Sequence, residues 1–166
     1  MKTLILTRHA KSSWDNPLLG DHQRVLNDRG RKNATAMAEW LRVVGHVPDA
    51  VLCSTAERCV QTWEQIELKL RSGAELNYES GLYHSAADQI IAYLRKAHAG
   101  TVQLIAHNPG IGDAAMRLAK TPAAHDAFFR YPTCATTIYT FNINAWSDLQ
   151  FGQGKIDYFQ IPRELP

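Results

Sequence analysis

Two arginines and two histidines follow three short apolar runs of the sequence. Arg8 and His9 come after residues 4–6, and Arg58 comes shortly after residues 51–53. His107 comes directly after residues 102–106. Apolar runs of this length are typical of strands that are buried on both faces of a sheet. In an open α/β sheet, ligands bind beyond the carboxyl ends of the strands. Guanidinium groups match phosphate oxygens, and a neutral imidazole can accept a phosphoryl group. The four residues therefore predict a phosphate-handling site at one edge of a sheet.

The segments between the apolar runs have the spacing of amphipathic helices. Apolar residues recur at i, i+3, i+4 and i+7 in four stretches: 34–41, 56–63, 87–94 and 111–118. Strands are expected at 136–143 and 155–161, and a weaker one near 76–79. This order predicts a three-layer α/β/α sandwich around a mostly parallel sheet with an antiparallel edge. No linker or repeat interrupts residues 1–166, so a single domain is expected.

The composition excludes several classes of protein. Hydrophobic residues make up 45% and charged residues 20% of the chain, as in globular domains. The net charge of +2 is too small for a nucleic-acid coat or a polybasic membrane anchor. No apolar run approaches the ~18 residues of a membrane span, and the N-terminal run is too short for a secretory signal. Three cysteines cannot all pair within one chain, so we expect reduced thiols in the cytoplasm, with no nucleic-acid or membrane partner.

Some patterns near these residues have simpler structural interpretations. Cys53 and Arg58 are similar to the Cys-x5-Arg loop of cysteine-dependent phosphatases, but only four residues separate them. Cys53 is better interpreted as a small core residue. Ser54-x-x-Glu57 predicts a capping box for the following helix. No pair of histidines has the spacing of a zinc site, so no metal site is expected.

A further cap is expected at the last helix. Asn108 followed by Pro109 suits an N-cap and a first helical position. Taken singly, each arginine or histidine behind an apolar run is as easily a surface or structural residue as a functional one. Their joint occurrence at three successive strand ends favours a functional site.

Three ordered motifs resemble those of the histidine phosphatase superfamily, whose members are phosphoglycerate-mutase-like: Thr7-Arg8-His9-Ala10, Ser54-x-x-x-Arg58-x-x-Gln61-Thr62 and Ala106-His107-Asn108-Pro109. The resemblance extends from Lys2 to about Ile143. The short chain and its Arg-His-Ala-Lys-Ser segment are most similar to the branch typified by the phosphohistidine phosphatase SixA. The resemblance implies a phosphoglycerate-mutase-like α/β fold and a phosphatase that requires neither a metal ion nor another cofactor.

The resemblance also implies a role for each matched residue. His9 becomes the nucleophile that accepts the phosphoryl group. Arg8, Arg58 and His107 become the pocket that binds this group and stabilises its transfer. Arg24, in the stretch Arg24-x-Leu26…Gly30, is a weaker candidate for a phosphate contact.

The sequence departs from the family pattern at two places. Ala10 replaces the glycine of the Arg-His-Gly signature and leaves both functional residues intact. Larger members carry a general-acid glutamate in a Leu-x-Glu element after the second helix. The nearest match here is Leu82-Tyr83-His84, which makes His84 the candidate proton donor.

The missing glutamate bears on the substrate. An alkoxide leaves poorly unless it is protonated, whereas imidazole, with a pKa of ~6.5, leaves readily. The lack of a clear acid therefore favours phosphoramidates such as phosphohistidine, or reactive aryl phosphates. The resemblance to SixA agrees with this, and it implies a phosphatase that removes the phosphoryl group from phosphohistidine on a signalling protein. The alternatives are a phosphatase of small phosphate esters and a non-catalytic phosphoprotein-binding module, against which the intact His9 argues.

Overall fold

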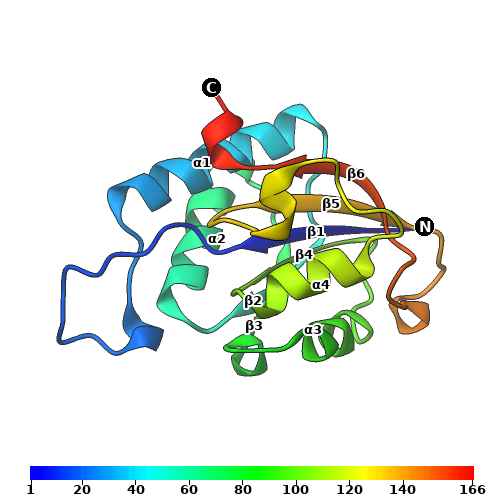
Figure 1. Ribbon diagram of the computed structural model, residues 1–166, viewed down its shortest axis with the longest axis horizontal. Helices are drawn as coiled ribbons and strands as arrows, with labels where there is room; N and C mark the ends of the chain where they lie inside the picture. The colour runs from blue at the N-terminus through cyan, green and yellow to red at the C-terminus, as the bar shows by residue number, and fades with distance from the viewer.

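A six-stranded mixed sheet forms the centre of the protein, with the strand order β3-β2-β4-β1-β5-β6 (Figure 1). The computed structural model describes all residues from Met1 to Pro166. The strands are β1 (Lys2–Arg8), β2 (Ala50–Ser54), β3 (Glu75–Glu79), β4 (Thr101–Ala106), β5 (Thr136–Phe141) and β6 (Lys155–Gln160). The first four are parallel, whereas β5 runs antiparallel to β1, and β6 runs antiparallel to β5. The prediction of a mostly parallel sheet with an antiparallel edge is confirmed.

Four helices cover the two faces of the sheet, so that the molecule has three layers (Figure 1). The helices are α1 (Asp28–Val43), α2 (Glu57–Leu70), α3 (Ala87–Leu94) and α4 (Gly110–Leu118). All four predicted helices are confirmed, and their periodic apolar residues are buried except Val60, which is half-buried. Side chains alternate between the faces of a strand, so Leu4 and Leu6 join one core and Ile5 joins the other. No helix is long and apolar enough to cross a membrane.

The predicted caps of α2 and α4 are wrong. The N-cap of α2 is Ala56, which makes no side-chain cap, and Ser54 lies before the helix. The N-cap of α4 is Pro109 rather than Asn108. The side-chain nitrogen of Asn108 instead donates to the carbonyls of residues 130 and 131. Ser54 and Asn108 thus both contact segments that are distant in the sequence. These tertiary contacts compete with capping of the neighbouring helix.

Two helices begin in backbone contact with loops at the carboxyl edge of the sheet, and glycine permits both contacts. A Cβ atom on Gly30, in the first turn of α1, would lie 2.1 Å from the carbonyl oxygen of Lys11. A Cβ atom on Gly110, at the start of α4, would lie 1.8 Å from the carbonyl oxygen of Ser85. Any side chain at these positions would push the helix away from the loop. The glycines therefore help to hold the loop after β1 and the loop before α3 in place.

Candidate active site

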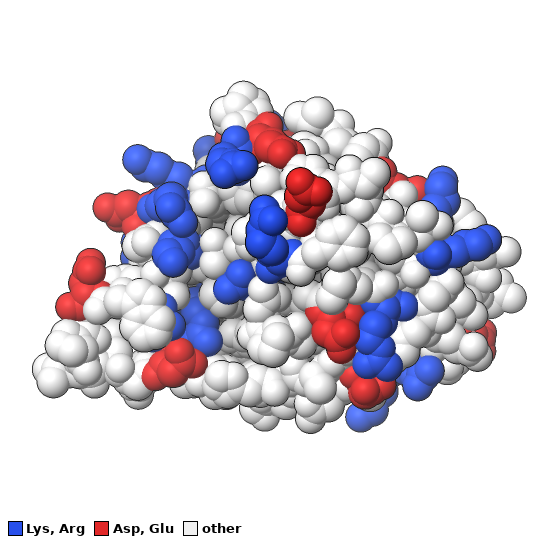
Figure 2. Space-filling model, viewed as in Figure 1, with Lys and Arg blue, Asp and Glu red and all other residues white.

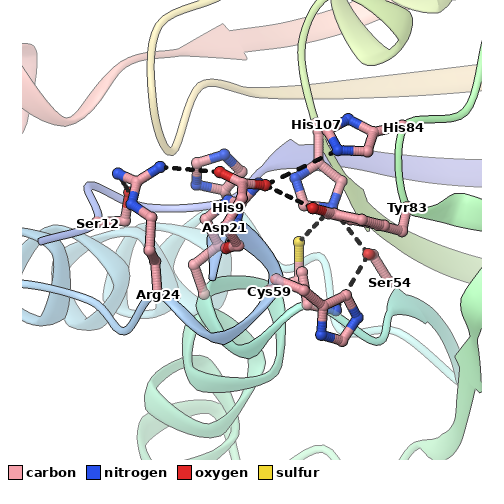
Figure 3. Close-up of polar contacts among 12 residues, drawn as sticks. His9, Ser12, Asp21, Arg24, Ser54, Cys59, Tyr83, His84 and His107 are labelled. Carbon is pink, nitrogen blue, oxygen red and sulfur yellow. Dashed lines mark hydrogen bonds and ion pairs between the residues drawn. The ribbon is translucent and has the colours of Figure 1, made fainter. Parts of the chain in front are cut away.

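The carboxyl ends of three adjacent strands, β1, β4 and β2, bring the predicted residues together. His9 follows β1, His107 follows β4, and Arg58 lies in the first turn of α2, after β2. The ring centroids of His9 and His107 are 5.2 Å apart (Figure 3). Arg8 and Arg58 are close enough to His9 to lower its pKa. The structure thus assembles His9, Arg8, Arg58 and His107 at one edge of the sheet.

His9 is a buried, neutral imidazole with one free nitrogen. Its Nδ1 atom lies 2.7 Å from the carbonyl oxygen of Ala10, and only 7% of the residue is exposed. A carbonyl oxygen can only accept, so Nδ1 carries the proton and Nε2 keeps its lone pair. Burial first, and the nearby arginines second, lower the pKa of His9 to about 3. These are the properties of a nucleophilic histidine.

His107 faces His9 with a proton donor that has no protein partner. Its Nε2 atom is 2.8 Å from Oγ of Ser54 and 3.4 Å from Sγ of Cys59. Ser54 accepts a hydrogen bond from the amide of Ala56, which leaves its hydroxyl proton free to donate to Nε2. This pattern favours the tautomer with the proton on Nδ1, which is buried and has no partner. The proton on Nδ1 is available to an anionic ligand.

Burial also keeps His107 uncharged. Desolvation first, and the electrostatic interactions with His9 and Arg58 second, lower its pKa to about 3. A neutral imidazole keeps one donor and one acceptor nitrogen, whereas the charged form has two donors. His107 can therefore accept from Ser54 and donate from Nδ1 at the same time.

Asp21 joins the two sides of the site and was missed by the sequence analysis. It lies in a short 3-10 helix (Asp21–Gln23), and its carboxylate contacts the guanidinium groups of Arg58 at 3.1 Å and of Arg24 at 3.2 Å. The hydroxyl of Tyr83 donates to the same carboxylate at 2.6 Å (Figure 3). The bond from Tyr83 and the two arginines hold the pKa of Asp21 well below its usual range. Asp21 is therefore a permanent anion that orients Arg58.

The arginines differ in how many donors remain free. Arg58 is 5% exposed and directs Nη1 to the backbone carbonyl of Asp21 at 2.7 Å. Arg24 has a protein partner on every guanidinium nitrogen: the carbonyl of Ser13, the carboxylate of Asp21 and the hydroxyl of Ser12. In Arg8, Nη1 donates to the carbonyl of residue 131 at 3.0 Å, while the buried Nε has no partner. Arg24 thus belongs to the frame around the site, and Arg8 retains a free donor.

His84 lies at the rim of the site, where the family pattern would place an acid. Its side chain is 65% exposed, and its Nε2 atom is 3.8 Å from the carboxylate of Asp21. The ring centroids of His84 and His107 are 6.3 Å apart. The backbone of His84 has a φ angle of 55°, a left-handed conformation that turns the chain before α3. The role of His84 as proton donor stays a prediction.

The three cysteines are not suited to be nucleophiles. All are buried and unpaired. Burial raises the pKa of Cys59 and of Cys134 to about 12, and that of Cys53 well above its usual range. A nucleophilic cysteine acts as the thiolate, which these environments disfavour. The interpretation of Cys53 as a core residue is confirmed by its full burial.

The buried neutral histidines predict a loss of stability in acid. His9 and His107 have pKa values near 3 in the folded protein and would take up protons near pH 6.5 when unfolded. Between these values the unfolded chain binds more protons, so the free energy of unfolding falls as the pH is lowered. Each histidine contributes up to ~1.4 kcal/mol per pH unit in this window.

Urea titrations of wild type and His107→Asn at pH 7.0, 5.5 and 4.5 test this prediction. Asparagine cannot be protonated, so the variant should lose less stability between pH 7.0 and pH 4.5 than the wild type. Equal losses in the two proteins would show that His107 is not held neutral by the fold.

Comparisons with known proteins agree with this geometry. The family model that describes the histidine phosphatase superfamily (branch 1) matches residues 4–83 of this chain. An uncharacterized protein of Mycobacterium leprae is 29% identical over 164 residues, which are 94% of this chain and 99% of that protein. A chloroplastic protein of Arabidopsis thaliana, also uncharacterized, is 28% identical over 158 residues, 89% of this chain and 70% of that protein.

Solved structures show the same fold. The chain is similar to a proposed phosphohistidine phosphatase, SixA from Nakamurella multipartitia, with 28% identity and a TM-score of 0.83 over 97% of this chain and 96% of that one. A protein histidine phosphatase SixA solved with tungstate has 21% identity and a TM-score of 0.79 over 97% of both chains. With its ordered motifs, its strand order and its paired histidines, the chain resembles the histidine phosphatase superfamily and, within it, the SixA proteins.

Proposed function

We propose that this protein is a phosphatase that acts on phosphohistidine of a signalling protein through a phosphohistidine intermediate on His9. The observation that carries the proposal is the free Nε2 atom of His9, a buried neutral nucleophile beside arginines. The similarity to the protein named phosphohistidine phosphatase SixA supports the choice of substrate.

The reaction would proceed in two transfers. In the first, Nε2 of His9 attacks the phosphorus atom, and the bond from phosphorus to the substrate nitrogen breaks. The substrate imidazole leaves with the bonding electron pair and regains a proton. In the second, water attacks the phosphorus atom of phosphorylated His9, the P–N bond breaks, and inorganic phosphate is released with the histidine restored.

The surrounding cations would stabilise the charge on the transferred group. Phosphoryl transfer needs positioning and charge stabilisation more than covalent chemistry from the protein. The Nε atom of Arg8 and the Nδ1 atom of His107 are buried donors without protein partners, which a bound anion would satisfy. Arg58 adds positive charge from a guanidinium that Asp21 holds in a fixed orientation. The arginines would thus supply the charge that a metal ion provides elsewhere, so the proposed reaction needs none.

The carboxylate of the site would not serve as a proton donor. Asp21 carries the carboxyl group that contacts the arginines, and its pKa lies well below the usual range because of Tyr83 and the arginines. A group that remains ionised cannot protonate a departing oxygen. Imidazole needs less assistance than an alkoxide because it is a weaker base. The site therefore favours phosphohistidine over alkyl phosphates.

A series of leaving groups tests this proposal. Across aryl phosphates of increasing phenol pKa, log kcat/KM should fall steeply, because the charge on the departing oxygen is not neutralised. Alkyl phosphates should be nearly inert, and a phosphohistidine-bearing protein should be hydrolysed well, with EDTA present throughout. A flat series would contradict the absence of an acid.

The variant His84→Ala is the matched control for this series. If His84 is not a donor, the variant should hydrolyse phosphohistidine at nearly the wild-type rate and show the same slope. A series that is flat in wild type and steep in His84→Ala would identify His84 as the acid. That outcome would favour small phosphate esters as substrates instead.

A further inference from the structure

A cavity of about 840 Å³ is lined by none of the candidate active-site residues and has no role in the proposed reaction. Its walls come from the first turns of α1, from residues 124–133 ahead of β5 and from the C-terminal residues 161–163. Lys and Arg side chains gather in the left half of the face in Figure 2, which contains α1 and the C-terminal turn in Figure 1. Three arginines line the cavity: Arg29, Arg130 and Arg163. The cavity is therefore markedly cationic.

These three arginines are exposed and carry unused binding capacity. None of them has an ion pair or a side-chain hydrogen bond within the protein. One carboxylate, that of Asp126, lines the same cavity, and the nearby Glu164 is already paired with His125 at 2.8 Å. The arginines thus outnumber the free carboxylates of the cavity. Arginine without an internal partner at a concave surface fits an anionic ligand, since its planar fork matches carboxylates bidentately.

The cavity and the candidate active site share one segment of backbone. Residues 130, 132 and 133 line the cavity, and the carbonyl of Tyr131 accepts hydrogen bonds from Arg8 and Asn108 on the catalytic side. The amide of Cys134 donates to the carbonyl of His9 at 3.0 Å. A ligand that occupies the catalytic pocket and a ligand that occupies the cavity would therefore lie on either side of the same segment. A single polypeptide substrate could contact both.

The size and the lining of the cavity favour a peptide over a single small anion. A volume of about 840 Å³ lies in the range of pockets that enclose ligands much larger than phosphate, which is ~300–1,000 Å³. Ala127, Pro132 and Ile161 line the same cavity as the arginines and add apolar groups to its surface. An acidic peptide offers carboxylates for the arginines and apolar side chains for these surfaces.

We propose that this cavity docks an acidic segment of the phosphorylated protein, beside the phosphohistidine that His9 attacks. The identity of the partner as a phosphoprotein rests on the proposed function, whereas binding of an acidic segment does not. Exposed charges of this kind mainly raise association rates and make binding sensitive to salt. The cavity would thus add affinity for the protein substrate without taking part in the chemistry.

Direct binding tests the proposal without any turnover. The probe is a fluorescein-labelled peptide of alternating Glu and Ala, compared with the same peptide in which Gln replaces Glu, by fluorescence anisotropy at low and at high salt. We expect the Glu peptide to bind at least ~10-fold more tightly than the Gln peptide at low salt, and this difference to shrink as salt is added. Millimolar orthophosphate should not displace the Glu peptide, because it would occupy the catalytic pocket instead.

Two variants locate the binding surface. Arg130→Ala/Arg163→Ala should weaken the Glu peptide by ~10-fold at low salt, whereas Arg42→Ala, at an exposed arginine near the end of α1, should leave it unchanged. The control for folding is a urea titration of the double variant. A midpoint close to that of wild type would show that unfolding is not the cause of the weaker binding. The proposal would be overturned if the double variant bound the Glu peptide as tightly as wild type does. It would also be overturned if Arg42→Ala lost as much affinity as the double variant, or if orthophosphate displaced the peptide.

A kinetic comparison connects the surface with the substrate. In the double variant, kcat/KM for a phosphohistidine protein with an acidic flanking segment should fall by ~10-fold through KM, with kcat/KM for an aryl phosphate unchanged. A fall for both substrates would contradict a docking role. If wild type fails to hydrolyse the phosphoprotein at all while the peptide still binds as expected, the proposed function fails and the acidic docking surface stands.

Discussion

Replacement of His9 by alanine is expected to reduce phosphatase turnover by at least ~10³-fold, to the background rate of the assay. Alanine removes the Nε2 atom that would form the bond to phosphorus, and no other nucleophile can replace it, because burial keeps the cysteines protonated. The measurement is steady-state hydrolysis of an aryl phosphate and of a phosphohistidine protein. Orthophosphate should still bind to the variant, since Arg8, Arg58 and His107 remain.

Cys53→Ser is the matched control for the loss of a nucleophile. Cys53 lies in β2, is fully buried and makes a contact with the carbonyl of Ser54 at 3.4 Å. A serine of similar size should keep most of the turnover, although it will cost some stability because its hydroxyl is more polar. Full activity in His9→Ala, or complete inactivation in Cys53→Ser with the fold retained, would contradict a histidine nucleophile.

Replacement of Arg58 by alanine is expected to lower kcat/KM by at least ~10²-fold, about 2.7 kcal/mol of transition-state stabilisation. Arginines that contact the transferred group in phosphoryl transfer typically contribute factors of ~10³–10⁵. Arg58 is nearly buried, so water could not replace its charge effectively. Arg58→Lys should restore little, because an ammonium lacks the fork that Asp21 orients. Wild-type rates in Arg58→Ala would place the transferred phosphate elsewhere.

Two neighbouring variants separate contact with phosphate from orientation. Asp21→Asn keeps the size of the side chain but removes the charge that orients Arg58, so kcat should fall by ~10-fold with a smaller change in KM. Arg24→Ala should do less damage than Arg58→Ala, because every guanidinium nitrogen of Arg24 already has a protein partner. If Arg24→Ala lowered kcat/KM as much as Arg58→Ala does, Arg24 would have to contact the substrate.

The order of strands and helices could be predicted because the signals for it are local. Each buried strand is a short apolar run, and each helix repeats its apolar residues with the helical period. The position of His9, Arg58 and His107 follows from that order, because parallel strands bring their carboxyl ends to one edge. The family motifs then identified the same residues by a second route.

The remaining parts of the site depend on contacts between segments that are distant in the sequence. Asp21, Arg58 and Tyr83 meet from three different segments, and no spacing predicts this meeting. The pair Asp21-x-x-Arg24 is the one local signal that could have drawn attention to the carboxylate. Ser54 was interpreted as a cap because its spacing to Glu57 matches a capping box. In the structure its hydroxyl contacts His107 instead, a tertiary partner that the sequence pattern does not reveal.

Trapping of the phosphorylated enzyme tests the central claim most directly. The protein is mixed with an aryl phosphate, quenched in base within a single turnover and analysed by mass spectrometry of its peptides. The account predicts one phosphoryl group on His9 that is stable in base and labile in acid, and none in His9→Ala. A phosphoryl group on a cysteine or on His107, or single-turnover hydrolysis without any phosphorylated enzyme, would contradict it.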